Sequence, residues 1–176
     1  MRTFYRFDPG PQMPELVRMI VEIPKNSNHK FEFDPDHGVF QLSRTLYSPI
    51  HYPGDYGFIP GTVAEDADPL DILCMVNSPS YPGILIYVRP VAVLDLVDEG
   101  KLDHKILAVP NRDPRFDAIR SLVDMRPHWR AELEHFFAIY KELEEKETEI
   151  RGWRDREDAW QVIRESRLSW ETNANG

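Results

Sequence analysis

The chain has 176 residues, of which 41% are hydrophobic and 29% are charged, a composition typical of a globular protein with one hydrophobic core. We therefore expect a single domain over residues 1–176. The formal net charge is −9, from 21 Lys and Arg against 30 Asp and Glu. This balance argues against a partner that is nucleic acid or an anionic membrane, because binding to either needs excess positive charge.

Nothing in the sequence indicates a membrane or a secreted protein. No apolar run approaches the roughly 20 residues that a membrane-spanning helix needs. The first residues, MRTFYRFDPGPQMPE, lack the apolar core of a secretory signal. The one cysteine, Cys74, lies in the apolar run DILCMV and cannot form an internal disulfide. We therefore expect a cytoplasmic protein.

Short apolar segments separated by turns fill the first two thirds of the chain. Several alternate apolar and polar residues as strands do, and the expected strands are 16–23, 30–33, 38–42, 71–76, 84–96 and 104–109. Pieces rich in proline and glycine, such as HYPGDYG and SPSYPG, lie between them. Five or more short strands at this spacing predict a small closed or partly open barrel.

After Asp117 the pattern becomes helical. Apolar residues recur at the spacing of an amphipathic helix: Trp129, Leu133, Phe136, Phe137 and Tyr140. We expect the charged stretch KELEEKETE, residues 141–149, to continue this helix. A second helix is expected from near Asp155, whose carboxylate is a good N-cap. This helix would carry three residues on one side: Trp160, Ile163 and Arg167.

The densest chemical signal is EDADPLD at residues 65–71. Pro69 denies this segment a regular helix or a central strand, so we expect a loop. In a strand, Asp68 and Asp71 would point to opposite faces, whereas a turn at Asp68-Pro69 would let all three aspartates converge. Converging carboxylates are neutralised by protonation, a salt bridge or a hard divalent cation. A solvated acidic turn is the alternative, and an EF-hand is disfavoured because Asp71 and Asn77 stand where it needs Gly and Glu.

A second acidic segment, DLVDEGKLDHK at residues 95–105, has the character of a hairpin. Taken alone it could be a polar hairpin tip. Two acid-rich loops at the ends of apolar strands together resemble the two sides of a metal site. Lys105 is two residues from Asp103, so both side chains would lie on one face of a strand.

Other polar and aromatic residues are scattered along the chain: Glu22, Lys30, Glu32, Arg44, Tyr52, Tyr56, Tyr140 and Lys141. Lys30 and Glu32 would share one face of a strand, which is also typical of a surface ion pair. The tyrosines could equally belong to the core.

Taken together and in this order, these pieces resemble the family I soluble inorganic pyrophosphatases. EDADPLD matches the D-x-D-P-x-D signature of that family, and IVEIP, KFEF, HYPGDYGFIPGT, RPVAVL, DEGKLDHKILAVP and HFFAIYKELE match its flanking segments. The resemblance implies a mainly β, α+β fold, with a five-stranded OB-like barrel and two helices of the C-terminal region packed on it. It also implies hydrolysis of pyrophosphate to two orthophosphates and a homo-oligomer, a hexamer being common among short members.

The same resemblance implies roles for individual residues. Asp68 would be the general base that helps deprotonate the attacking water. Mg²⁺, or alternatively Mn²⁺ or another divalent ion, would be held or influenced by seven carboxylates: Glu22, Glu32, Asp66, Asp71, Asp98, Glu99 and Asp103. Among these, Glu22 would act through metal-bound water. The substrate would contact or face seven further residues: Lys30, Arg44, Tyr52, Tyr56, Lys105, Tyr140 and Lys141.

Two other functions are weighed against this one. A metal-dependent hydrolase of nucleoside polyphosphates is disfavoured, because the chain has no G-x-x-x-x-G-K-[ST] loop. A non-catalytic OB-type module for single-stranded nucleic acid is disfavoured by the charge of −9 and by acidic clusters where a basic groove is needed.

Overall fold

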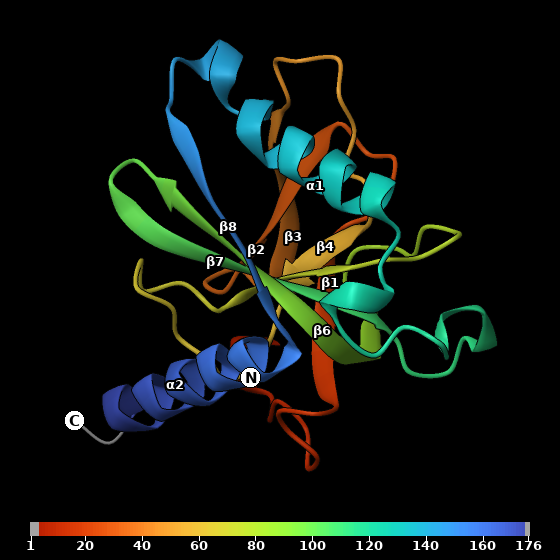
Figure 1. Ribbon diagram of the computed structural model, residues 1–176. Helices are drawn as coiled ribbons and strands as arrows, with labels where there is room; N and C mark the ends of the chain where they lie inside the picture. The colour runs from red at the N-terminus through yellow and green to blue at the C-terminus, as the bar shows by residue number, and fades with distance from the viewer. Residues whose placement is uncertain (1–3, 175–176) are drawn as a thin grey trace.

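The computed structural model describes residues 4–174, and its centre is a closed ring of five strands (Figure 1). In chain order the strands are β1 (Val17–Ile23), β2 (His29–Asp34), β3 (Val39–Thr45), β4 (Asp55–Phe58), β5 (Asp71–Cys74), β6 (Leu85–Asp98), β7 (Lys101–Pro110) and β8 (Thr148–Asp155). The two helices are α1 (Pro127–Ile139) and α2 (Arg156–Ala174).

The ring follows the order β1-β4-β5-β7-β6, and β6 pairs back with β1. Only the β5–β7 pairing is parallel among these neighbours. This arrangement confirms the predicted OB-like barrel. β8 adds to the outer edge of β6, while β2 and β3 form a separate hairpin.

β4 was not predicted, because the segment HYPGDYG is typical of a turn. The strand is fully buried and lies between β1 and β5. A Cβ built at Gly57 would lie 1.9 Å from the carbonyl oxygen of Ile20 on β1. Glycine is therefore required for these two backbones to approach so closely.

The expected helix over residues 141–149 is wrong. α1 ends at Ile139, a one-turn 3-10 helix η4 (Glu142–Glu144) follows, and Glu145 has a left-handed φ of 58°. Residues 148–155 then form β8, which pairs with β6. The helix propensity of a glutamate-rich segment is a weak preference, and hydrogen bonding to an existing strand outweighs it here.

The two helices cover different sides of the barrel (Figure 1). The predicted apolar stripe of α1 is confirmed, since Leu133, Phe136 and Phe137 are buried. α2 begins next to Asp155 as expected, and Oδ1 of Asp155 accepts the Arg156 N–H at 2.8 Å.

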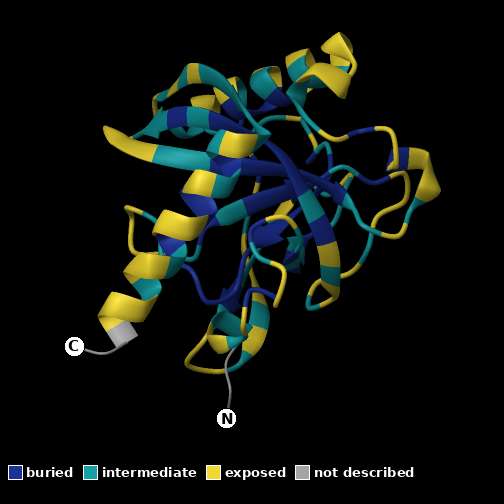
Figure 2. Cartoon of the chain, turned by 60° about the horizontal axis from the view of Figure 1, so that its bottom comes forward, coloured by how far each residue is buried: buried dark blue, intermediate teal, exposed yellow. Residues whose placement is uncertain are grey.

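The buried stripe of α2 comprises Ala159, Val162, Ile163 and Ser166 (Figure 2). The expected residues Trp160 and Arg167 only flank this stripe and stay partly exposed. No helix within residues 4–174 is long and apolar enough to cross a membrane.

Candidate active site

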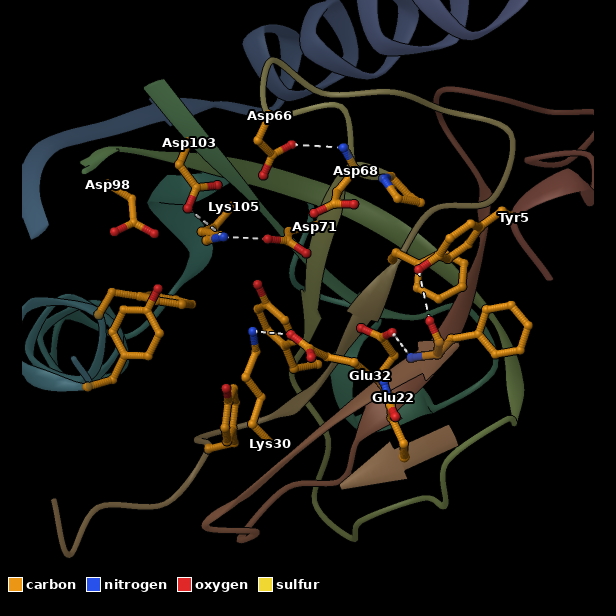
Figure 3. Close-up of a pocket in the computed structure, with 18 of the residues that line it drawn as sticks. Tyr5, Glu22, Lys30, Glu32, Asp66, Asp68, Asp71, Asp98, Asp103 and Lys105 are labelled. Carbon is orange, nitrogen blue, oxygen red and sulfur yellow. Dashed lines mark hydrogen bonds and ion pairs between the residues drawn. The ribbon is translucent and has the colours of Figure 1, made fainter. Parts of the chain in front are cut away.

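An open cavity of about 510 Å³ lies where β2, the β4–β5 loop, the β6–β7 hairpin and the end of α1 meet. Figure 3 shows Asp66, Asp71 and Asp103 on one side of it, opposite Lys30 and Glu32. Segments far apart in the sequence thus bring carboxylates and ammonium groups to one place.

The acidic segment 65–71 is a loop, as expected, and its turn begins earlier than predicted. The N–H of Ala67 donates to the carbonyl of Ala64 at 3.2 Å, and Ala67 has a φ of 74°. The Asp68 N–H then donates to Oδ1 of Asp66 at 3.1 Å. The turn therefore lies at residues 64–67 rather than at Asp68-Pro69, and it brings two aspartates side by side before Asp71 opens β5.

Asp68 lines the cavity while remaining accessible to solvent. Partial burial by the cavity walls raises the pKa of its carboxyl, and the negative charges of Asp66 and Asp71 raise it further. A carboxylate with a raised pKa is a better proton acceptor than an ordinary aspartate, which suits a general base.

The second acidic segment forms the predicted hairpin. Asp98 on β6 pairs with Lys101 on β7, and the two residues between them have φ of 48° and 82°. These positive φ angles at Glu99 and Gly100 are those of a tight two-residue hairpin turn. The turn fixes the register that directs Asp98 and Asp103 into the cavity.

Lys105 joins the two acidic segments. Its Nζ lies 2.7 Å from Oδ2 of Asp103 and also contacts Oδ2 of Asp71. Burial alone would lower the pKa of Lys105, but the charges of both aspartates outweigh it and raise the pKa above its usual value. Burial and the repulsion of Asp71 raise the pKa of Asp103 despite its ammonium partner.

The carboxylates suit a hard divalent cation in chemistry, although they are not gathered around one position. Within residues 4–174, no three His, Cys, Asp or Glu side chains are close enough to hold a metal ion. Lys105 and Lys141 lie among them instead, since Lys141 contacts Oδ2 of Asp98. Oδ1 of Asp98 is buried and has no hydrogen-bond partner in the described part of the chain. This unpaired oxygen and the all-oxygen donor set fit a cation such as Mg²⁺.

The opposite wall is built on β1 and β2. Lys30 and Glu32 share one face of β2, as predicted, and their charged atoms are 2.5 Å apart. Burial raises the pKa of Glu32, but hydrogen bonds from Lys30 and Ser43 outweigh it and leave the pKa below its usual value. Glu22 on β1 accepts the Phe33 N–H at 2.8 Å, and burial raises its pKa to about 8.

Three tyrosines line the cavity and pack in the core at the same time. The ring centroids of Tyr52 and Tyr56 are 5.4 Å apart, and Tyr140 stacks on Phe136 at 5.6 Å. Burial raises the pKa of all three phenols, which therefore stay protonated and neutral. Such hydroxyl groups can donate hydrogen bonds to an anion without adding charge.

All the predicted site residues except Arg44 and Glu99 line this cavity. Arg44 lies against Glu144, and Glu99 is exposed at the hairpin tip with Lys146 at 3.2 Å. Several lining residues were not predicted: Tyr5, Phe33, Asp34, Pro35, Gln41, Phe58, Pro69 and Phe137. Tyr5, whose hydroxyl donates to the carbonyl of Phe33 at 3.1 Å, has no sequence signal, whereas Asp34 begins the turn-rich DPDHG.

Comparison with known proteins decides the family. A family model described as inorganic pyrophosphatase matches residues 19–171. The chain belongs to the inorganic pyrophosphatase family. It is 45% identical over 151 residues to the inorganic pyrophosphatase of Geobacillus stearothermophilus, covering 86% of this chain and 92% of that relative. With the inorganic pyrophosphatase of a Nostoc species it shares 43% identity over 158 residues, covering 90% and 94%.

The fold of the family agrees with that of this chain. The crystal structure of inorganic pyrophosphatase from Thermus thermophilus superposes with a TM-score of 0.94 at 39% identity, covering 97% of this chain and 99% of that one. The resemblance inferred from EDADPLD and its flanking segments is thereby confirmed, as is the mainly β fold with two helices.

Proposed function

We propose that this chain hydrolyses inorganic pyrophosphate to two orthophosphates. One observation carries the proposal: in a member of the inorganic pyrophosphatase family, the acidic segments 65–71 and 95–105 face lysines and tyrosines across one cavity. A cavity with both signs of charge suits a small polyanion that binds together with cations.

We assign Mg²⁺ as the cofactor, with Mn²⁺ or another divalent ion as the alternative. The candidate ligands are Glu32, Asp66, Asp71, Asp98 and Asp103, with Glu99 close by and Glu22 acting through metal-bound water. When bound, such ions neutralise phosphate charge and lower the pKa of a water molecule. Support comes from the carboxylate oxygens that line the cavity and from the unpaired, buried oxygen of Asp98.

Asp68 would act as the general base, accepting at a carboxylate oxygen the proton that the attacking water gives up. Its access to solvent within the cavity and its raised pKa support this role. The neighbouring carboxylates of Asp66 and Asp71 contribute to this raised pKa, because their negative charges repel the charge of ionised Asp68.

The cations and tyrosines would bind and orient the two phosphoryl groups. Lys30, Lys105 and Lys141 act as point charges, whereas the guanidinium of Arg44 can donate two parallel hydrogen bonds. The neutral hydroxyls of Tyr56 and Tyr140 donate further hydrogen bonds, and Tyr52 lines the site. Phosphoryl transfer depends mainly on such positioning and charge stabilisation.

We also propose that residues 1–176 act as one domain in a cytoplasmic homo-oligomer, with a hexamer as the expected size. Exposed apolar residues on β3, before β6 and at the start of β6 offer subunit contacts: Val39, Leu42, Tyr81, Ile84, Leu85 and Tyr87. The buried thiol of Cys74 is compatible with a reducing compartment. Size-exclusion chromatography with light scattering tests the assembly, and a monomer would contradict it.

A phosphate-release assay tests the activity. Pyrophosphate should be hydrolysed in the presence of Mg²⁺ much faster than nucleoside triphosphates, and exhaustive chelation should abolish turnover. Equal rates on pyrophosphate and on nucleoside triphosphates would favour the alternative function, a metal-dependent hydrolase of nucleoside polyphosphates. Tight binding of a single-stranded oligonucleotide without pyrophosphate hydrolysis would favour the binding module.

A further inference from the structure

Arg44 is the one proposed phosphate ligand that does not line the cavity; it is paired with an acidic residue that follows α1. Nε of Arg44 lies 2.8 Å from Oε1 of Glu144. The side chains are 23% and 9% exposed, respectively. Water and salt screen an ion pair at this depth less than a pair on the surface.

A β-bulge determines which way Arg44 points. Lys30 pairs with Arg44, whereas the next residue, Phe31, pairs with Leu42, so Ser43 is an extra residue in β3. Directly paired residues lie on one face of a hairpin, and a bulge redirects the side chains beyond it. Arg44 is therefore on the same face as Lys30, which lines the cavity.

The guanidinium of Arg44 has unused hydrogen-bonding capacity. Its Nε and Nη2 are both buried, and neither has a hydrogen-bond acceptor among residues 4–174. The contact with Glu144 is close, but it is not aligned as a hydrogen bond. Buried N–H groups without acceptors are unfavourable, and a phosphate oxygen is an acceptor that arginine recognises well.

Glu144 sits on a segment that also carries proposed substrate ligands. Glu144 is the last residue of η4. This short helix directly follows Tyr140 and Lys141, both of which line the cavity. The Glu144 N–H donates to the carbonyl of Lys141 at 2.9 Å. The ion pair therefore links the β2–β3 hairpin, with Arg44, to the segment that presents Lys141.

We propose that Glu144 is a positioning residue that holds Arg44 ready to bind a phosphate oxygen of pyrophosphate or of the product. The inference rests on the proposed phosphate-binding role of Arg44. An arginine side chain has many rotamers, and a carboxylate that already restricts them lowers the entropy lost on binding. Loss of Glu144 therefore weakens phosphate binding more than it slows the chemical step.

Two measurements on the full chain with Mg²⁺ test this role: calorimetric titration with inorganic phosphate and steady-state hydrolysis of pyrophosphate. The proteins are wild type, Glu144→Gln, Arg44→Lys, the double variant and the control Glu142→Gln, which changes an exposed glutamate of the same turn. Glu144→Gln should weaken phosphate binding and raise KM about tenfold, with kcat nearly unchanged. The double variant should bind no more weakly than Arg44→Lys, and the control should match wild type.

Three outcomes would overturn the proposal. Glu144→Gln could bind phosphate as tightly as wild type, or the double variant could lose the binding free energy of both single variants added together. The third outcome is a fall in kcat of Glu144→Gln with phosphate binding and KM unchanged. If circular dichroism shows that Glu144→Gln is unfolded, Glu144→Asp replaces it. This variant keeps the charge and withdraws the carboxylate by one methylene, so unchanged phosphate binding would again overturn the role. Failure of the wild type to hydrolyse pyrophosphate would instead contradict the proposed function, while the phosphate titration would still report on Glu144.

Discussion

Nζ of Lys105 lies 2.7 Å from Oδ2 of Asp103, two residues earlier on the same face of β7. The same ammonium group contacts Asp71 at the start of β5. Lys105 is only 5% exposed, so this single positive charge acts at short range on carboxylates from both acidic segments. It offsets the repulsion that their convergence creates.

In the presence of a chelator and without Mg²⁺, Lys105→Met should destabilise the protein by about 3–5 kcal/mol, because the variant leaves partly buried carboxylates without their cation. Urea denaturation with and without Mg²⁺ measures the change, and a bound cation should restore part of the loss. Lys101→Met is the matched control, since Lys101 is exposed on the same strand. Equal losses in both variants would contradict a special role for the Lys105 charge.

Asp68→Asn should lower kcat by roughly 10²–10⁴-fold while the fold is retained, because the amide cannot accept the proton. Steady-state hydrolysis measures kcat, and circular dichroism checks the fold. Glu65→Gln is the control on the same loop, where Glu65 is exposed. Activity within a few fold of wild type would remove Asp68 from the role of base.

If Mg²⁺ is the cofactor, as we propose, it should stabilise the folded chain, since the candidate ligand carboxylates are brought to one cavity only by folding. An ion at about 100 times its dissociation constant stabilises by about 2.7 kcal/mol. Thermal unfolding in Mg²⁺ and in NaCl of matched ionic strength distinguishes this effect from screening. Identical melting temperatures in the two salts would argue against a metal site.

Glu22 should make the stability of the metal-free protein, measured in the presence of a chelator, depend on pH. Burial raises its pKa from 4.5 to about 8, so the folded state favours the protonated carboxyl. Protonated Glu22 contributes this stability in full below pH 4.5. The contribution falls as pH rises above 4.5 and is lost once pH has risen through about 8. Between about pH 5 and about pH 9, the free energy of unfolding should fall a few kcal/mol more in wild type than in Glu22→Gln.

Urea titrations in chelator at those two pH values measure this difference. The glutamine retains an oxygen that can accept the Phe33 N–H, so only the titration is removed. The same pH dependence in both proteins would contradict the raised pKa of Glu22.

Glu145→Gly should stabilise the fold by about 0.5–1 kcal/mol, because Glu145 adopts a left-handed φ of 58° that glycine adopts without strain. Chemical denaturation measures the gain. Glu142→Gly is the control, since Glu142 has helical geometry in η4, where glycine should destabilise. A loss of stability in Glu145→Gly would contradict the strain assigned to this position.

The strands with alternating or continuous apolar residues were predictable from the sequence, because the positions of their apolar side chains indicate which faces are buried. β4 was not, since its glycine is needed for close approach to Ile20, a contact from another part of the chain. β8 was not predicted, and its first two residues were expected to be helical, because its pairing with β6 has no signature in residues 148–155 themselves. Local propensity predicts structure only where a distant partner does not outweigh it.

The motifs of the sequence and the family resemblance that they carry were enough to determine the family, the two acidic segments and most of the charged and polar residues that line the cavity. Their side-chain types and order along the chain carry that information. Only the tertiary structure decided that Lys105 contacts a carboxylate of each acidic segment, that Tyr5 borders the cavity and that Arg44 forms an ion pair with Glu144. These relationships join residues far apart in the chain, so they exist only once the barrel has closed and the β2–β3 hairpin and α1 have packed around it.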